Sequence, residues 1–167
     1  YGGDYSDTYT LDANIDIRNT TIAGEIGNDS SIVIQQELDP EHTIAVNISD
    51  SIVEGPIPFS AVPASTADLG ATISMQHSMT TVPVEGIGNQ IGQAIFTQGP
   101  LGDFYLAQIP AGNLQTSPGV DAGDPDSSSP FLGGTRSDGG LDTGLSDLGY
   151  HYPTRIGSSS VSLHLEE

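Results

Sequence analysis

The sequence predicts an all-β fold of the β-solenoid type, in which short strands form stacked coils. Related stretches begin at Ile15, Ile44 and Ile73, so one pattern recurs about every 29 residues. Apolar and polar residues alternate within each copy, as in a β-strand, and no segment carries the stripe of a long amphipathic helix. Repeats of this length are typical of solenoids and arrays. A β-sandwich with fortuitous spacing is the alternative.

The candidate core consists of the apolar residues that alternate within the three copies. Each coil would turn these side chains inward and pair with the coils above and below it, about 4.8 Å away. A further strand is expected over residues 31–36, and the three prolines of residues 56–70 indicate a loop. The alternating residues are Ile15, Ile17, Ile44, Val46, Ile48, Ile73 and Met75.

The chain is expected to form one domain, or part of a larger one, since 167 residues fall within the usual size range. Residues 1–14 are polar and predict an irregular entry. Residues 15–153 hold the coils and the segment that closes them, and residues 154–167 form a tail. The chain begins at Tyr1 rather than Met, so we expect a mature product, a fragment or a trimmed chain.

The charge of the chain restricts its partners. Asp and Glu number 22, whereas Lys and Arg number 3, for a formal net charge of −19. Such a chain should repel nucleic acid and anionic lipid, because phosphate binding requires Lys or Arg. Cations, neutral glycans and basic proteins remain as partners, and no apolar stretch is long enough to insert across a membrane. The absence of cysteine excludes disulfides, thiolate metal sites and cysteine nucleophiles.

The second half of the chain carries motifs that point to a known class of proteins. They are Gly88-Asn89, Ile95-Phe96, Gly102–Leu106 and the turn at residues 117–124, followed by residues 135–153. Together they resemble the closing coils of secreted, right-handed parallel β-helix proteins of the pectate-lyase-like class. The resemblance implies a short right-handed parallel β-helix with an irregular C-terminal closure. It also implies a secreted or cell-surface, and thus extracellular, location.

This stack of coils is short for the class it resembles. Proteins of that class are usually several times longer, and only three to four coils are visible here. A short stack leaves strand edges unpaired at its ends. We therefore expect a partner at an open coil end, which is the chain's own N-terminal portion, a second chain, or another copy through self-association.

Two acidic loops are candidate calcium sites. Calcium takes about six to eight oxygen ligands from carboxylates and carbonyls on a bent backbone, and both loops are rich in Asp and Gly. The alternative is turn chemistry, since Asp side chains often cap free backbone N–H groups. No cofactor is required under the second interpretation. The residues concerned are Asp121, Asp124 and Asp126 in one loop, and Asp138, Asp142 and Asp147 in the other.

No residue of the chain is assigned a catalytic role. The resemblance brings in polysaccharide lyases, which use a basic side chain, but Arg18, Arg136 and Arg155 lie in separate regions. Glycoside hydrolysis needs paired carboxylates. None here stands in the Asn-Thr-Asp, Asp-Asp or Gly-His-Gly context of the family's hydrolases. The balance of these observations is against an enzyme in this segment.

Tyrosines and asparagines supply two further kinds of candidate site. Tyr105, Tyr150 and Tyr152 would stack on sugar rings if exposed, or close the core if buried. Asparagine sequons permit N-glycosylation in a secretory host, although a chain rich in Asn, Ser and Thr also contains them by chance. The sequon positions are Asn19, Asn28 and Asn47.

Three functions are consistent with these residues. The leading one is a non-catalytic extracellular β-helix module with a structural, adhesive or assembly role. The second is the C-terminal part of a polysaccharide lyase or glycoside hydrolase whose catalytic coils lie outside this chain. The third is a calcium-dependent, glycan-binding module. A fold of this kind hosts many functions, so the choice depends on the site.

Overall fold

A computed structural model describes residues 13–23, 30–36, 44–55, 57–63, 71–126 and 133–153 of the chain. These residues form thirteen β-strands and one short 3₁₀ helix, η1 (Ile109–Ala111). The prediction of an all-β fold is confirmed. The predicted tail over residues 154–167 and most of the predicted entry lie outside the described residues. No helix in the described ranges is long and apolar enough to cross a membrane.

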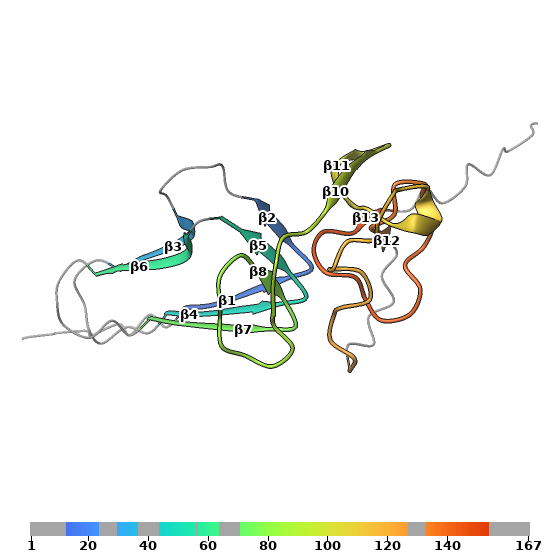
Figure 1. Ribbon diagram of the computed structural model, residues 1–167. Coiled ribbons are helices and arrows are strands. Elements are labelled where there is room, and N and C mark those ends of the chain that lie inside the picture. The colour runs from blue at the N-terminus through green and yellow to red at the C-terminus, as the bar shows by residue number, and fades with distance from the viewer. Residues whose placement is uncertain are drawn as a thin grey trace, which may run out of the picture.

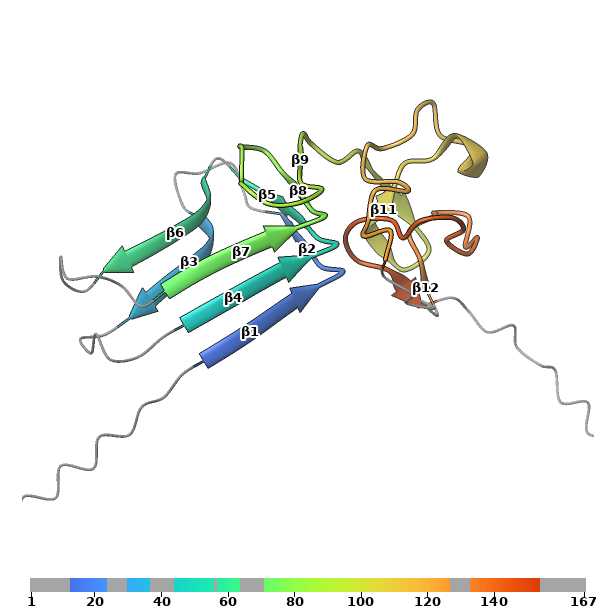
Figure 2. The same cartoon turned by 90° about the horizontal axis from the view of Figure 1, so that it is seen from below.

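Three parallel sheets form the N-terminal half of the described chain (Figures 1 and 2). Successive units of the chain add one strand each to these sheets, so strands of consecutive units lie side by side. We call β1 to β3 the first unit, β4 to β6 the second, and β7 with β8 the third. The first sheet contains β1 (Ala13–Arg18), β4 (Ile44–Ser49) and β7 (Ala71–Gln76). The second contains β2 (Thr21–Ala23), β5 (Ile52–Glu54), β8 (Met79–Thr80) and β9 (Gln90–Ile91), and the third contains β3 (Ser30–Gln36) and β6 (Ile57–Pro63).

The register of the first sheet differs from the uniform repeat expected from the sequence. Ala13 pairs with Ile44, an offset of 31 residues, and Ile44 pairs with Ala71, an offset of 27. A spacing of 29 is therefore two residues too short for the first step and two too long for the second. Side chains of a strand alternate with a period of two, so a shift of two residues leaves every inward position inward. The apolar pattern alone cannot distinguish these registers.

The first core cluster lies between the sheets and contains all of the predicted alternating residues except Ile15. Val46, Ile48 and Met75 are buried, and Val53 of the second sheet packs with them. Ile15 pairs with Val46 in the register yet is 47% exposed. Ile15 is exposed because β1 is the outermost described strand of the first sheet.

The predicted loop over residues 56–70 is wrong in its first part, which is strand β6. This strand pairs in parallel with β3, and β3 confirms the strand expected over residues 31–36. The described part of the third sheet contains only these two strands. Edge strands accept proline because one side of the strand needs no N–H donor, which explains a strand in so proline-rich a segment.

A tight corner joins the first sheet to the second in every unit. Asn19, Asp50 and His77 occupy equivalent corner positions, with φ angles of 46°, 50° and 43°. Asn, Asp and His are enriched among the few residue types found in this left-handed conformation. Gly88, with a φ of 70°, occupies a fourth corner position, because the His77 N–H donates to the carbonyl oxygen of Ile87 at 2.7 Å.

Parallel pairing ends at β9, and the rest of the described chain is antiparallel or irregular. We call residues 92–126 and 133–153 the C-terminal segment. It contains the hairpin of β10 (Phe96–Gly99) and β11 (Gly102–Leu106), and the pair of β12 (Gly133–Gly134) and β13 (Tyr152–Pro153). The motifs that resemble closing coils therefore include an antiparallel hairpin.

The C-terminal segment packs against the side of the second sheet. Ile52 faces away from Val53 and is fully buried in a second core cluster with Met79, Leu106 and Leu148. The second sheet is thus covered on both faces. Backbone contacts hold the same junction, because the Gly149 N–H donates to the carbonyl oxygen of Asp50 at 2.9 Å. The segment lies beside the ends of β1, β4 and β7 in both views (Figures 1 and 2).

Candidate functional site

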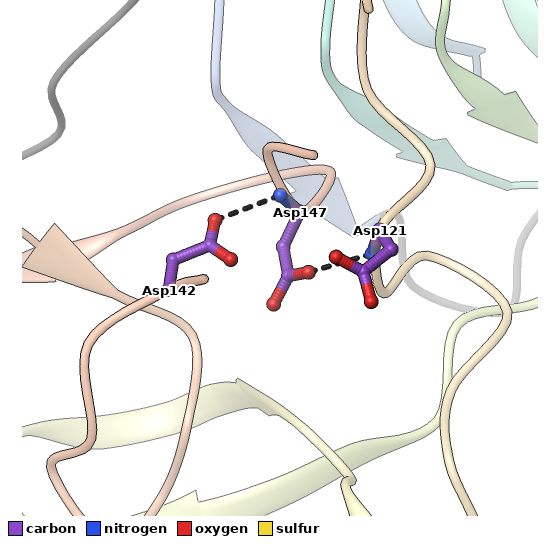
Figure 3. Close-up of side chains that lie close together, drawn as sticks. All are labelled: Asp121, Asp142 and Asp147. Atoms are coloured by element: carbon purple, nitrogen blue, oxygen red, sulfur yellow. Dashed lines mark hydrogen bonds between the residues drawn. The ribbon is translucent and has the colours of Figure 1, made fainter. Parts of the chain in front are cut away.

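Two loops of the C-terminal segment cross and bring three aspartates together. The Gly123 N–H donates to the carbonyl oxygen of Ser146, and the Leu148 N–H donates to that of Gly119, each at 2.8 Å. These bonds set the loop around residue 121 against the loop over residues 142–147. The three aspartates are Asp121, Asp142 and Asp147, which we call the acidic cluster (Figure 3).

Asp147 is the buried centre of the acidic cluster, with 1% of its surface exposed. Its Oδ1 accepts a hydrogen bond from the Asp121 N–H at 2.7 Å. Its Oδ2 accepts from Gln108 Nε2 at 3.0 Å and from the hydroxyl of Thr135. Burial raises the pKa of the Asp147 carboxyl, whereas the bonds from Thr135 and Asp121 lower it. The side chain therefore joins three separate parts of the segment.

Asp142 occupies the second position of the acidic cluster and is also held by the protein. Its Oδ2 accepts from the Asp147 N–H at 2.9 Å and lies 3.1 Å from His151 Nε2 (Figure 3 shows the first of these bonds). The other ring nitrogen of His151 lies 3.0 Å from the carbonyl oxygen of Gly149. The arrangement fixes the chain just before β13.

Asp121 is the exposed member of the acidic cluster. Its carboxylate borders a cavity of about 250 Å³ that Asp142, Asp147 and Arg136 also line. One oxygen atom from each of the three carboxylates lies within 4.8 Å of the others, so a small cation could be held there. Calcium needs about six to eight oxygen ligands, and Asp147 Oδ2 already accepts two hydrogen bonds. The cluster thus offers fewer free ligand atoms than its three carboxylates suggest.

The structure groups the six candidate aspartates differently from the sequence. Asp124 and Asp126 do not join Asp121. The Asp124 N–H donates to Asp50 Oδ1 at 2.7 Å, and the Asp124 carboxylate lies 3.7 Å from Nδ1 of His77. The Asp126 N–H donates to Asp124 Oδ1 at 2.9 Å, a local turn contact. These two residues follow the alternative interpretation, turn chemistry and loop attachment.

Asp138 is likewise separate from the acidic cluster, because it forms an ion pair with Arg136. Its two oxygens lie 2.6 Å and 3.0 Å from the guanidinium nitrogens, and it also accepts from the Gly140 N–H. The hydrogen bonds from Arg136 lower the pKa of the Asp138 carboxyl to about 2. The two charges therefore neutralise each other locally. The pair also lines a neighbouring cavity of about 320 Å³.

The three candidate sugar-stacking tyrosines pack on one another. The rings of Tyr105 and Tyr152 stack with centroids 3.9 Å apart, and both residues are buried. Tyr150 contacts the edge of Tyr152 and is 45% exposed. Gly99 lies against the Tyr105 ring, since a Cβ there would approach it to 2.5 Å. The ring faces of Tyr105 and Tyr152 are therefore largely used within the fold.

The candidate glycosylation positions differ in access. The Nδ2 atom of Asn19 is buried and has no hydrogen-bond partner, so a glycan there would require the corner to open. Asn47 lies on the outer face of the first sheet, where its Nδ2 donates to Asn14 and Asp16. Asn28 lies outside the described residues. Among the described positions, Asn47 is the more accessible acceptor.

Sequence reasoning missed the polar residues that support the acidic cluster. Gln108 and Thr135 are buried and bond to Asp147 and to each other, yet they stand far from it in the chain. No local motif marks either residue. Asp50 was also missed, because a uniform spacing of 29 aligns Ile48 with Asn19 and His77, whereas the observed register places Asp50 at that corner.

Comparison with known proteins adds no identification. No family model, curated protein or solved structure matches this chain. The contacts described above are therefore the basis for a function.

Proposed function

We propose that this chain is a non-catalytic structural module of an extracellular protein, secreted or on the cell surface. Its three parallel sheets are interpreted as coils of a short right-handed parallel β-helix, related to the pectate-lyase-like class. The C-terminal segment closes and stiffens the side of this stack. One observation carries the proposal, namely that the polar groups of the acidic cluster are used to fasten loops together.

The bonding of Asp147 supports a structural role over a catalytic one. A general acid or nucleophile must present an oxygen to the substrate. Asp147 instead accepts three hydrogen bonds from within the fold, from Asp121, Gln108 and Thr135. Asp142 similarly holds the Asp147 N–H and faces His151. Asp121 is the exposed carboxylate of the cluster, and the hydrogen bonds of Asp142 and Asp147 hold those two side chains within the fold.

A matched pair of substitutions tests the structural role. Asp147→Ala removes acceptors from three buried or partly buried donors, so we expect the free energy of unfolding to fall by about 2–4 kcal/mol. Asp121→Ala keeps the backbone N–H that Asp147 binds, and we expect a change within about 1 kcal/mol. Urea unfolding followed by circular dichroism measures both variants. Equal losses in the two variants would contradict the assignment.

The absence of catalysis is tested with the unmodified chain. Polygalacturonate and neutral glucans would be incubated with it, and new reducing ends and unsaturated products measured over days. We expect no release above a heat-treated control, since Asp142 and Asp147 are hydrogen-bonded within the fold and Arg136 is paired with Asp138. Turnover at ordinary enzymatic rates, of order 1 per second or more, would overturn the proposal.

A second candidate function is calcium-dependent binding of a neutral glycan. The close approach of three carboxylate oxygens beside the 250 Å³ cavity favours it. If calcium binds there, millimolar Ca²⁺ should raise the melting temperature of chelator-treated protein, and Asp121→Asn should abolish the rise. An unchanged melting temperature would exclude the cluster as a calcium site. Mg²⁺ is the control, since a site specific for Ca²⁺ should respond less to it.

A further inference from the structure

The two ends of the stacked units are finished differently. At one end, Asn89 seals the third unit. Its Oδ1 accepts from the Ser78 N–H at 3.2 Å, and its Nδ2 donates to the carbonyl oxygen of Met75 at 2.9 Å. At the other end, β1 pairs with β4 alone among the described strands, and its residue Ile15 is 47% exposed. The edge at β1 therefore lacks an equivalent of Asn89 within the described ranges.

A chain of hydroxyl groups runs through the corners and points toward this edge. The Ser51 N–H donates to Ser78 Oγ at 3.1 Å, and the Thr20 N–H donates to Ser51 Oγ at 3.2 Å. Each hydroxyl donates in turn to the carbonyl oxygen two residues before it. Thr20 Oγ1 is the next acceptor of the series, and no described N–H donates to it. The pattern leaves one acceptor facing the preceding position of the stack.

Backbone groups at the same corner follow a complementary rule. The N–H groups of Ile52, Met79 and Gln90 donate to the carbonyl oxygens of Thr20, Ser51 and Ser78, at 2.8 to 2.9 Å. Thr21 stands at the position equivalent to Ile52. Its N–H is thus directed at a carbonyl of a preceding unit. The edge therefore presents one donor, the Thr21 N–H, and one acceptor, Thr20 Oγ1. Their positions match those of the groups that join consecutive units at the other corners.

We propose that the edge formed by β1, Thr20 and Thr21 binds a further unit of the same repeat, supplied by another polypeptide segment. This inference rests on the proposed β-helix. The segment would run parallel to β1 and place apolar side chains over Ile15 and Ile17. Its corner residue would have a left-handed conformation, and the next residue would give its N–H to Thr20 Oγ1 and its carbonyl to Thr21. Seated there, it would bury Ile15 as Val46 is buried one step along the stack.

A second copy of this chain is a poorer occupant of the edge. Two copies related by a two-fold axis would pair β1 with β1 in antiparallel orientation. One register places Asp16 opposite Arg18 twice, which is favourable, but the reversed strand cannot present a corner to Thr20 and Thr21. A head-to-tail contact would have to displace the Asn89 seal. The charge of −19 on each copy also opposes association.

The experiment adds one unit to the full chain. Residues 44–70 are duplicated between Asp12 and Ala13, so that the copy stands before β1 as the second unit stands before β7. Hydrogen exchange of the Ile15 and Ile17 amides is measured with and without the insertion. We expect exchange of these amides to slow by about tenfold or more, and the melting temperature to rise by several degrees. The control insertion carries Val46→Asp and Ile48→Asp in the added copy, and should leave both values unchanged.

The outcomes separate this inference from the proposed function. Protected amides in β4 and β7, together with β1 amides that the insertion does not slow, would overturn the inference and leave the β-helix intact. Unprotected amides in β4 and β7 of the unextended chain would overturn the β-helix itself. Sedimentation of the unextended chain as a dimer that Arg18→Glu dissociates would show a second copy at β1, and would also overturn the inference.

Discussion

Gly88 occupies a corner where any side chain would be strained. Its φ of 70° lies in the left-handed region, and a Cβ there would come within 2.0 Å of His77 Cδ2. Gly139 offers a matched comparison, with a φ of 80° and open space around its missing Cβ. The two glycines therefore separate the cost of backbone conformation from the cost of crowding.

This comparison gives a prediction at the residue scale. Gly88→Ala should lower the free energy of unfolding by about 2–4 kcal/mol, because left-handed strain and overpacking add. Gly139→Ala should lower it by only about 1–2 kcal/mol. Urea unfolding at neutral pH measures both. A loss in Gly139→Ala as large as that in Gly88→Ala would contradict the contact with His77.

The Arg136–Asp138 pair gives a second residue-scale prediction, in its response to pH. The folded pKa of about 2 lies below the usual value of 3.8, so the carboxylate favours the folded state above about pH 4 and this contribution is lost as the pH falls toward 2. An NMR titration of the Asp138 carboxyl should show the low midpoint, and Arg136→Gln should raise it. A midpoint unchanged by Arg136→Gln would contradict the ion pair.

At the scale of an element, the corner hydroxyls add hydrogen bonds between consecutive units at the corners that join the first and second sheets. Ser51 is fully buried and bonds both to Thr20 and to the carbonyl oxygen of Ser49. Ser51→Ala should therefore lower the free energy of unfolding by about 1–3 kcal/mol, since it leaves the Thr20 N–H without its acceptor. Ser74→Ala, which removes an exposed bond to Asn47, is the control and should stay within about 0.5 kcal/mol. Thermal unfolding distinguishes the two variants.

Strands of the first sheet were predictable because one of their faces is buried. Alternation at Ile44, Val46 and Ile48 marks β4 directly. The second sheet was harder to predict, since Ile52 and Val53 are both buried on opposite faces and break the alternation. The register between strands of the first sheet could not be predicted, because a shift of two residues keeps every inward side chain facing inward. Strand β6 was missed because proline was taken to exclude a strand that stands at an edge.

At the scale of the whole molecule, tertiary packing determines which aspartates lie together, and sequence spacing does not predict this grouping. The acidic cluster joins Asp121 to two residues more than twenty positions later, while its sequence neighbours Asp124 and Asp126 turn elsewhere. The candidate set contained all three members of the cluster. Their grouping depends on how the two loops cross, which no local motif encodes.

Attachment of the C-terminal segment to the second sheet gives the whole-molecule prediction. Leu148 is fully buried between the two, so Leu148→Ala should lower the free energy of unfolding by about 2–5 kcal/mol. Amides of the C-terminal segment should then exchange faster while those of β4 and β7 keep their protection. Leu145→Ala, at a position 43% exposed, is the control and should cost about 1 kcal/mol or less. Equal acceleration in all sheets would indicate one inseparable cooperative unit.

The side-on attachment of the C-terminal segment has a mechanical consequence. The Gly149 N–H bonds to Asp50 of the second unit, and the Tyr150 N–H bonds to Thr21 of the first. Tension applied at residue 153 would therefore be transmitted to the first and second units, and would bypass the end of the stack at Asn89. Pulling from that side would load several strands together instead of peeling the last one away. A chain attached in this way shares an applied force between its first two units.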